Sequence, residues 1–204
     1  NRTARAYPSD KCLPELFEER VERSRGAVAV VCDGEAVTFG ELNRRANQLA
    51  HRLRAGGVGP DVPVAVMLER SPEMVAALLA VLKAGGASAP PDPSYPAGRL
   101  AFMLDDARAS LILTRESLLA KLPKQHRARA VCVDRDAAHI AAEPADNPGR
   151  TNVYEIGGLR IVVDYAHNPH GMAALAATLD RLPSKRRLVM IGQAFSNALQ
   201  AYVA

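Results

Sequence analysis

The alternation of strand and helix signals in the first two thirds of the sequence constrains the fold most. Val62 to Leu68 is an apolar run typical of a buried strand. Ser71 and Pro72 then provide a cap and a first-turn proline for a helix over Glu73 to Ala84. Strands that alternate with helices pair in parallel through crossover connections. We therefore predict an α/β fold with an incomplete parallel or mixed sheet layered with helices.

The remaining elements of this part follow from the same signals. Asp33-Gly34 predicts a tight hairpin turn, and Glu41 lies three residues after Thr38 in capping-box spacing. Further strands are expected at Ala27 to Cys32, Ala36 to Phe39, Ala87 to Pro91, Ser110 to Thr114 and, more weakly, Val131 to Val133. Further helices are expected at Cys12 to Ser24, from Thr38 to Gly56-Gly57, and at Pro96 to Ala107.

A change of composition at residues 137–150 predicts a domain boundary. Pro144, Pro148 and Gly149 disfavour helix and strand in this stretch. We therefore divide the chain into a domain at 1–136, a linker at 137–150 and a second domain at 151–204. The second domain is expected to be a small α/β, Rossmann-like segment. Its expected elements are a hairpin of Thr151 to Ile156 and Leu159 to Asp164 around Gly157-Gly158, a helix at Pro169 to Arg181 and a strand at Arg187 to Ile191.

Composition and charge exclude several classes of function. The formal charge of +4 is scattered, with no basic block and no interleaved aromatic residues, so we expect no nucleic-acid partner. No apolar run approaches the ~20 residues that span a bilayer, so no membrane partner is expected either. Cys12, Cys32 and Cys132 are widely spaced and odd in number, which favours reduced thiols in a cytoplasmic protein.

Three motifs in the first domain occur in a characteristic order. They are Ala36-Val37-Thr38-Phe39-Gly40-Glu41-Leu42-Asn43, Arg45-Ala46-Asn47-Gln48-Leu49-Ala50, and Leu82 to Leu100 (LKAGGASAPPDPSYPAGRL). Over residues 1 to about 135 the chain thereby resembles the N-terminal part of a nonribosomal peptide synthetase adenylation domain. The resemblance implies activation of an amino acid as its acyl-adenylate with ATP and Mg²⁺, and transfer to phosphopantetheine on a partner carrier domain.

The matched region is mainly scaffold. Its prolines fix the backbone after Ala89 and Asp92 can satisfy turn amides, so we interpret Lys83, Asp92 and Tyr95 as structural. The Ser/Thr/Gly-rich phosphate loop and the late catalytic lysine of that family cannot be assigned in this sequence. We therefore assign no catalytic residue, and the enzymatic status of the chain stays open at this point.

The second domain carries a different set of motifs. Asn147-Pro148-Gly149-Arg150, Gly157-Gly158 and Val163 to Pro169 (VDYAHNP) resemble the C-terminal domain of Mur-type ligases, within them most closely cyanophycin synthetase, over about 147–192. Such ligases phosphorylate a carboxylate with ATP and let an amine attack the acyl-phosphate. No G-x-x-x-x-G-K-[ST] phosphate loop accompanies the motifs.

The candidate nucleotide-binding residues are Arg150, Asp164, His167 and Asn168. Arg150 offers a fork for phosphate, and Asp164 follows an apolar strand where ribose hydroxyls could be bound. Asn168 would cap the next helix and leave its amides near a phosphate. Each has a plainer alternative: a linker charge, a turn acid or a helix cap. His167 and His170 have no third ligand nearby, so no metal site is expected.

Together these observations favour a fused or truncated chain from ATP-dependent carboxylate-activating ligases, inactive alone. Its expected partners are the rest of a synthetase, a carrier domain and an amino-acid substrate. A non-catalytic docking or assembly module is the alternative from another class, since a partial sheet exposes edges and core faces. Weak ATP binding by a ligase fragment is a third possibility.

Overall fold

The computed structural model describes residues 11–147, 152–156 and 159–163. The chain divides into two compact units, residues 1–148 and 149–204. The elements of the first unit are α1 Leu13–Ser24, β1 Val28–Cys32, β2 Glu35–Thr38, α2 Phe39–Ala55, β3 Pro63–Val66, α3 Pro72–Ala84, β4 Ala87–Ala89, α4 Ala97–Asp106, β5 Leu111–Thr114, the 3₁₀ helices η1 Glu116–Lys121 and η2 Lys124–Arg129, β6 Ala130–Cys132 and α5 Ala137–Ala141.

A four-stranded parallel sheet in the order β4-β3-β5-β6 forms the centre of the first unit. β3 is central and buried on both faces, which is why its sequence is a continuous apolar run rather than an alternating one. The predicted α/β architecture, a parallel sheet layered with helices, is confirmed.

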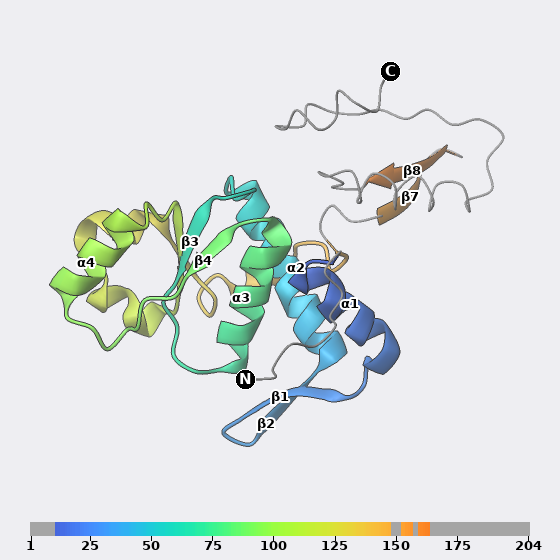
Figure 1. The fold of residues 1–204 in the computed structure, drawn as a ribbon, viewed down its shortest axis with the longest axis horizontal. Helices are drawn as coiled ribbons and strands as arrows, with labels where there is room; N and C mark the ends of the chain where they lie inside the picture. Colours follow the sequence, from blue (N-terminus) through green and yellow to red (C-terminus); the bar gives the residue numbers. More distant parts are fainter. Residues whose placement is uncertain (1–10, 148–151, 157–158, 164–204) are drawn as a thin grey trace, which may run out of the picture. The chain divides into compact units, whose positions relative to one another are not determined.

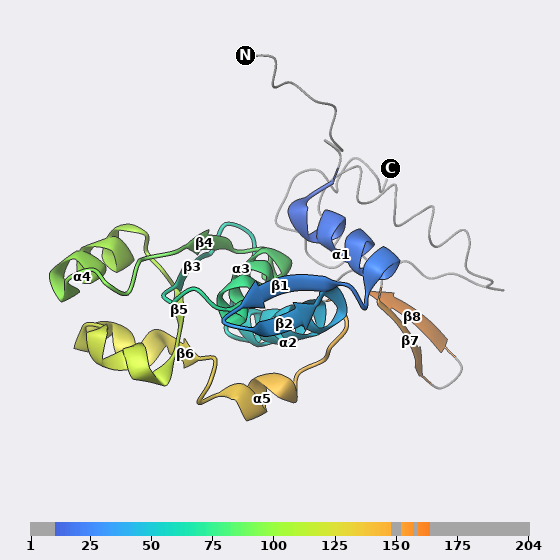
Figure 2. The same cartoon turned by 90° about the horizontal axis from the view of Figure 1, so that it is seen from below.

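Helices cover both faces of this sheet (Figures 1 and 2), and each face buries a separate apolar cluster. Val64 and Leu113 point to the face covered by α2 and α3. Ala65 and Ile112, their neighbours along β3 and β5, point to the opposite face, where α4 and the η1–η2 segment pack. This alternation places helices on both sides, as the strand–helix pattern of the sequence requires.

The hairpin β1–β2 forms its own antiparallel sheet beside α2 and α3. Its turn residues Asp33 and Gly34 have φ angles of 49° and 84°, the left-handed geometry of a two-residue hairpin. Val37 of the hairpin is buried with Leu42 of α2 and Ala76 of α3. The predicted hairpin and its tight turn are confirmed.

The helix caps follow the sequence closely. The Thr38 hydroxyl accepts from the Glu41 amide at 3.2 Å, and the Ser71 hydroxyl accepts from the Met74 amide at 3.2 Å. α3 ends at Gly85, whose φ of 90° is left-handed. The predicted starts of α2 and α3 are therefore confirmed.

Three short helices had no sequence prediction. η1 and η2 are 3₁₀ helices, which lack the 3.6-residue periodicity that marks an α-helix. α5 lies inside the stretch expected to have neither helix nor strand, so that part of the prediction was wrong. Pro144 does interrupt regular structure, but only after α5 has ended. The domain boundaries at 136 and 150 stay a prediction.

In the second unit the structure describes two strands, β7 Asn152–Ile156 and β8 Leu159–Val163, paired in antiparallel register. The predicted strands on either side of Gly157-Gly158 are thereby confirmed. The helix expected at Pro169 to Arg181 and the strand expected at Arg187 to Ile191 lie outside the described residues. Among the helices described, none has the length and apolarity required to cross a membrane.

Candidate functional site

The carboxyl ends of β3 and β5 form the place in this sheet where a ligand site is expected. The chain leaves β3 toward α3 on one face and leaves β5 toward η1 on the other, so the strand order reverses between them. Open α/β sheets bind ligands at such a reversal. Arg115 follows β5 directly, and Glu73 lies in the first turn of α3. Their guanidinium and carboxylate form an ion pair of 2.7 Å.

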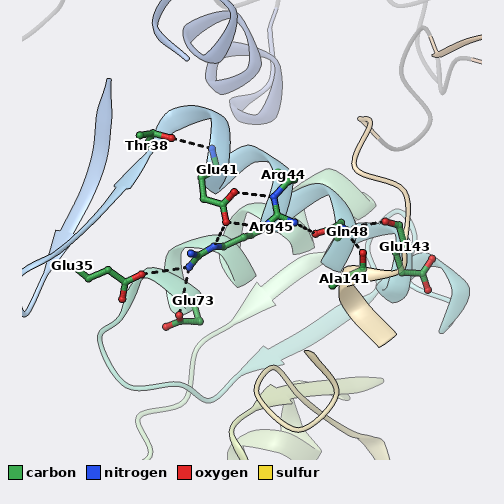
Figure 3. Close-up of polar contacts among 9 residues, drawn as sticks. All are labelled: Glu35, Thr38, Glu41, Arg44, Arg45, Gln48, Glu73, Ala141 and Glu143. Carbon is green, nitrogen blue, oxygen red and sulfur yellow. Dashed lines mark hydrogen bonds and ion pairs between the residues drawn. The ribbon is translucent and has the colours of Figure 1, made fainter. Parts of the chain in front are cut away.

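Glu73 belongs to a larger network of charges (Figure 3). Arg45 of α2 lies 3.7 Å from the Glu73 carboxylate and 3.7 Å from that of Glu35 on β2. Burial opposes ionisation of Glu73, but its own backbone amide, the Ser71 hydroxyl and Arg115 hold its pKa below the ordinary value. The network therefore joins the hairpin, both helices and the end of β5 through charges that satisfy one another.

Glu41 is the second acid of the network and the most strongly perturbed. Arg44 donates from Nε at 2.8 Å and from Nη2 at 2.7 Å, and Arg45 donates from Nε at 2.7 Å. These hydrogen bonds, those of Arg44 first, lower the pKa of Glu41 to about 2. Both guanidinium groups are partly exposed and paired with this carboxylate.

Three further acids near this edge of the sheet satisfy local backbone amides. Asp92 accepts from the Ser94 amide at 2.8 Å, and this hydrogen bond holds the pKa of Asp92 below its ordinary value. Asp134 accepts from the Glu116 amide at 3.0 Å, and Asp136 accepts from the Cys132 amide at 2.8 Å. Asp92 thus has the turn role predicted from the sequence.

Lys83 is buried and ion-paired. Its side chain is 1% exposed, its Nζ forms an ion pair with Glu18 of α1, and Nζ lies 3.3 Å from Asn147 Oδ1. The ammonium therefore holds α1 and the end of the first unit against α3. Tyr95 lies under the Arg99 guanidinium, 4.9 Å from the ring centroid. Both contacts fit the structural interpretation of Lys83 and Tyr95.

The four residues predicted to bind nucleotide, Arg150, Asp164, His167 and Asn168, lie outside the described residues. Their roles stay predictions. The residues that the structure brings together at the sheet edge, above all Glu73 and Arg115, had not been singled out. One signal could have found Arg115: a charged residue directly after an apolar strand of a parallel sheet.

In the described part of the sheet edge, two groups that could contact a phosphate are engaged by neighbouring side chains. Binding β- and γ-phosphates requires cationic side chains and backbone amides aimed at the ligand. Here Arg115 is engaged by Glu73, and the Met74 amide by Ser71. Across residues 11–147, no cluster of three or more His, Cys, Asp or Glu side chains could hold a metal ion. What the arrangement provides is rigid support, so we derive no chemical step from it.

Comparison with known proteins identifies relatives over most of the chain. The family described as AMP-binding enzyme matches residues 17–193. Chondramide synthase cmdD of Chondromyces crocatus is 50% identical over 151 residues, 72% of this chain and 4% of the relative. Tyrocidine synthase 3 of Brevibacillus parabrevis is 47% identical over 137 residues, 67% of this chain and 2% of the relative. The chain thus spans a few per cent of the length of these relatives.

Solved structures show the same fold. The nonribosomal peptide synthetase FmoA3, also solved with AMPPNP bound, is similar with a TM-score of 0.65 at 33% identity. The similarity covers 72% of this chain and 15% of that one. The N-terminal subdomain of NpsA from Klebsiella oxytoca has a TM-score of 0.57 at 26% identity, covering 68% of this chain and 35% of that one. The family match also extends through the range that resembled Mur-type ligases.

Proposed function

Because this chain belongs to the AMP-binding enzyme family, we propose that it supplies the N-terminal scaffold of an adenylation domain that activates an amino acid with ATP and Mg²⁺. The observation that carries the proposal is the identity of 47% to 50% to chondramide synthase and tyrocidine synthase over 67% to 72% of the chain. The partners are the remainder of the adenylation domain and a carrier domain whose phosphopantetheine thiol receives the acyl group.

The charges at the sheet edge support a scaffold role within that domain. They are paired with one another, and they connect the hairpin, α2, α3 and the end of β5. Positioning and neutralisation of the phosphates supply most of the rate in ATP-driven activation. We therefore expect no acyl-adenylate formation by the chain alone.

A chimaera tests the scaffold role. Residues 11–147 replace the aligned segment of an adenylation domain from tyrocidine synthase 3, and substrate-dependent exchange of pyrophosphate into ATP is measured. We expect exchange to persist with the amino-acid preference of the host, because a scaffold supports the substrate pocket without lining it. A folded chimaera that has lost exchange, or that prefers a different amino acid, would contradict the proposal.

A docking or assembly module remains a second candidate, and exposed apolar side chains favour it. Val31 on the hairpin and Phe102 on α4 are each 68% exposed. Such side chains are covered when a partner binds. Size-exclusion chromatography with the remaining part of an adenylation domain separates the candidates: a stoichiometric complex without exchange activity supports docking alone.

The Mur-type interpretation concerns residues 147–192 and rests on the motif from Val163 to Pro169. Under the Mur-type interpretation, a segment similar to cyanophycin synthetase binds ATP weakly through Arg150, Asp164, His167 and Asn168. Thermal stabilisation by ATP that disappears in Asp164→Ala would support it. Stabilisation by ATP that persists in Asp164→Ala, or no stabilisation at millimolar ATP, would contradict it.

A further inference from the structure

One side of α2 carries a row of polar side chains, of which Gln48 also contacts Arg44 of the charge network around Glu41. The row, here called the amide face, consists of Asn43, Asn47, Gln48 and His51. Asn43, Asn47 and His51 are four residues apart, and Gln48 and His51 are three apart, which are the spacings of neighbours on a helix surface. Asn47 and Gln48 are 1% and 7% exposed, which is unusual for amide side chains on a helix.

The amide face contacts the last residue of α5 and the chain that follows it, residues 141–147, here called the strap. Asn47 Nδ2 donates to the Ala145 carbonyl at 2.7 Å. Gln48 Nε2 donates to the carbonyls of Ala141 at 2.6 Å and Glu143 at 3.2 Å (Figure 3). His51 Nε2 lies 3.1 Å from the Asp146 carbonyl oxygen. Asn47 and Gln48 thus donate to main-chain oxygens, whereas His51 also contacts the Asp146 carboxylate at 3.3 Å.

Neighbouring groups hold the amide face in register. Gln48 Oε1 accepts from Arg44 Nη1 at 2.7 Å, so the amide nitrogen of Gln48 must face the strap. At the far end Asn147 Oδ1 lies 3.5 Å from Asn43 Nδ2 and 3.3 Å from Lys83 Nζ. Two sequence motifs, one on α2 and one around Lys83, therefore converge on a single residue of the strap.

We propose that the amide face of α2 is a peptide-binding site that recognises an irregular segment by its carbonyl oxygens, and that its occupant is the strap of this same chain. The site fixes where the chain leaves the first unit. It goes beyond the adenylation scaffold, because it assigns a binding role to Asn47 and Gln48 that does not depend on ATP or amino acid.

The strap depends on this site for its structure. α5 has five residues, and a helix of that length is unstable in water without tertiary contacts. The amides of Ala142 and Glu143 bond back to Ala138 and Ile140 at 3.2 and 3.1 Å. Release of the strap from α2 would therefore expose these two amides to solvent.

Recognition through the backbone also predicts tolerance of side-chain changes. In Figure 3 the Glu143 carboxylate points away from Gln48, while the Glu143 carbonyl meets the Gln48 amide. Removing the carboxylate should leave the site intact, whereas removing the Gln48 amide should not. This contrast separates backbone recognition from ordinary side-chain packing.

The test is hydrogen exchange at Ala142 and Glu143 in the full chain. Gln48→Met keeps the side-chain length but removes both donated bonds, so exchange should accelerate about tenfold, because the strap loses two of the hydrogen bonds that secure it. Asn47→Leu, which leaves Arg44 untouched, should also accelerate exchange. Glu143→Ala is the matched control on the strap and should change exchange by less than about twofold.

Two results would overturn the proposal. One is unchanged exchange in both Gln48→Met and Asn47→Leu while circular dichroism and exchange in the parallel sheet remain native. The other is an acceleration in Glu143→Ala as large as that in Gln48→Met. If Gln48→Met fails to fold, hydrogen exchange in Asn47→Leu, and in the double variant Asn47→Leu with Glu143→Ala, tests the proposal instead.

Discussion

At the scale of single residues, Lys83 shows how a position in a recognisable motif can have a structural role. The sequence places it near the end of a helix, where a lysine is ordinarily solvated. The structure instead buries its side chain at 1% exposure and pairs it with Glu18. Its helical position could be predicted, but its partner could not, because Glu18 is 65 residues away in the sequence.

Lys83→Met should destabilise the first unit by about 3 kcal/mol, because it leaves the Glu18 carboxylate without its buried cation. The measurement is the free energy of unfolding in urea. Lys121→Met, at a position of η1 on the surface, is the control and should change stability by less than about 0.5 kcal/mol. Equal stabilities of the Lys83 variant and the parent would contradict the role assigned to this ammonium.

Gly85→Ala should cost about 1–2 kcal/mol, because the φ of 90° at this position is strained for any residue with a Cβ. Gly98→Ala is the matched control: a Cβ there meets nothing within 4 Å, and the position is helical. The control should stabilise the chain by up to about 1 kcal/mol. In thermal unfolding, Gly85→Ala should melt at a lower temperature than the parent and Gly98→Ala at the same or a higher one. A Gly85→Ala variant as stable as the parent would contradict the role of the left-handed φ at this position.

At the scale of elements, the charge network around Glu41 holds α2, α3 and the hairpin together. The pKa of Glu41 is about 2, below the ordinary value of 4.5, so the folded state favours the charged form of this carboxylate. For a depressed carboxyl pKa the stabilisation is complete above pH 4.5 and is lost as pH falls toward 2. Stability should therefore decline across that window.

Glu41→Gln should flatten part of this decline, because glutamine does not titrate. Chemical denaturation at several pH values between the folded and the ordinary pKa measures the effect as a smaller pH dependence in the variant than in the parent. Glu22→Gln, at an exposed position of α1, serves as the control and should keep the parental slope. An unchanged slope in Glu41→Gln would show that Arg44 and Arg45 do not set the ionisation of Glu41.

The elements also show what sequence patterns can and cannot predict. The hairpin turn, the caps Thr38 and Ser71 and the parallel strands follow from local chemistry and were predicted. The Thr38 hydroxyl caps α2 as predicted, but the Glu41 carboxylate pairs with arginines of the same helix. α5 and the 3₁₀ helices were missed because their stability comes from tertiary contacts, which leave no periodic signal.

At the scale of the whole molecule, the described sheet and its helices form the framework of an adenylation domain. Its paired charges join elements to one another, as Glu73 and Arg115 illustrate. The fold class could be predicted because alternation of strands and helices is a property of the whole sequence. The nucleotide contacts proposed at Arg150, Asp164, His167 and Asn168 stay predictions, since the structure does not describe those residues.

We propose that this framework does not activate a carboxylate unaided. The most direct measurement is substrate-dependent exchange of labelled pyrophosphate into ATP by the purified chain, assayed with each amino acid in turn and beside an intact adenylation domain. We predict no exchange above the enzyme-free background for any amino acid. Exchange that requires both the chain and one particular amino acid would contradict the account.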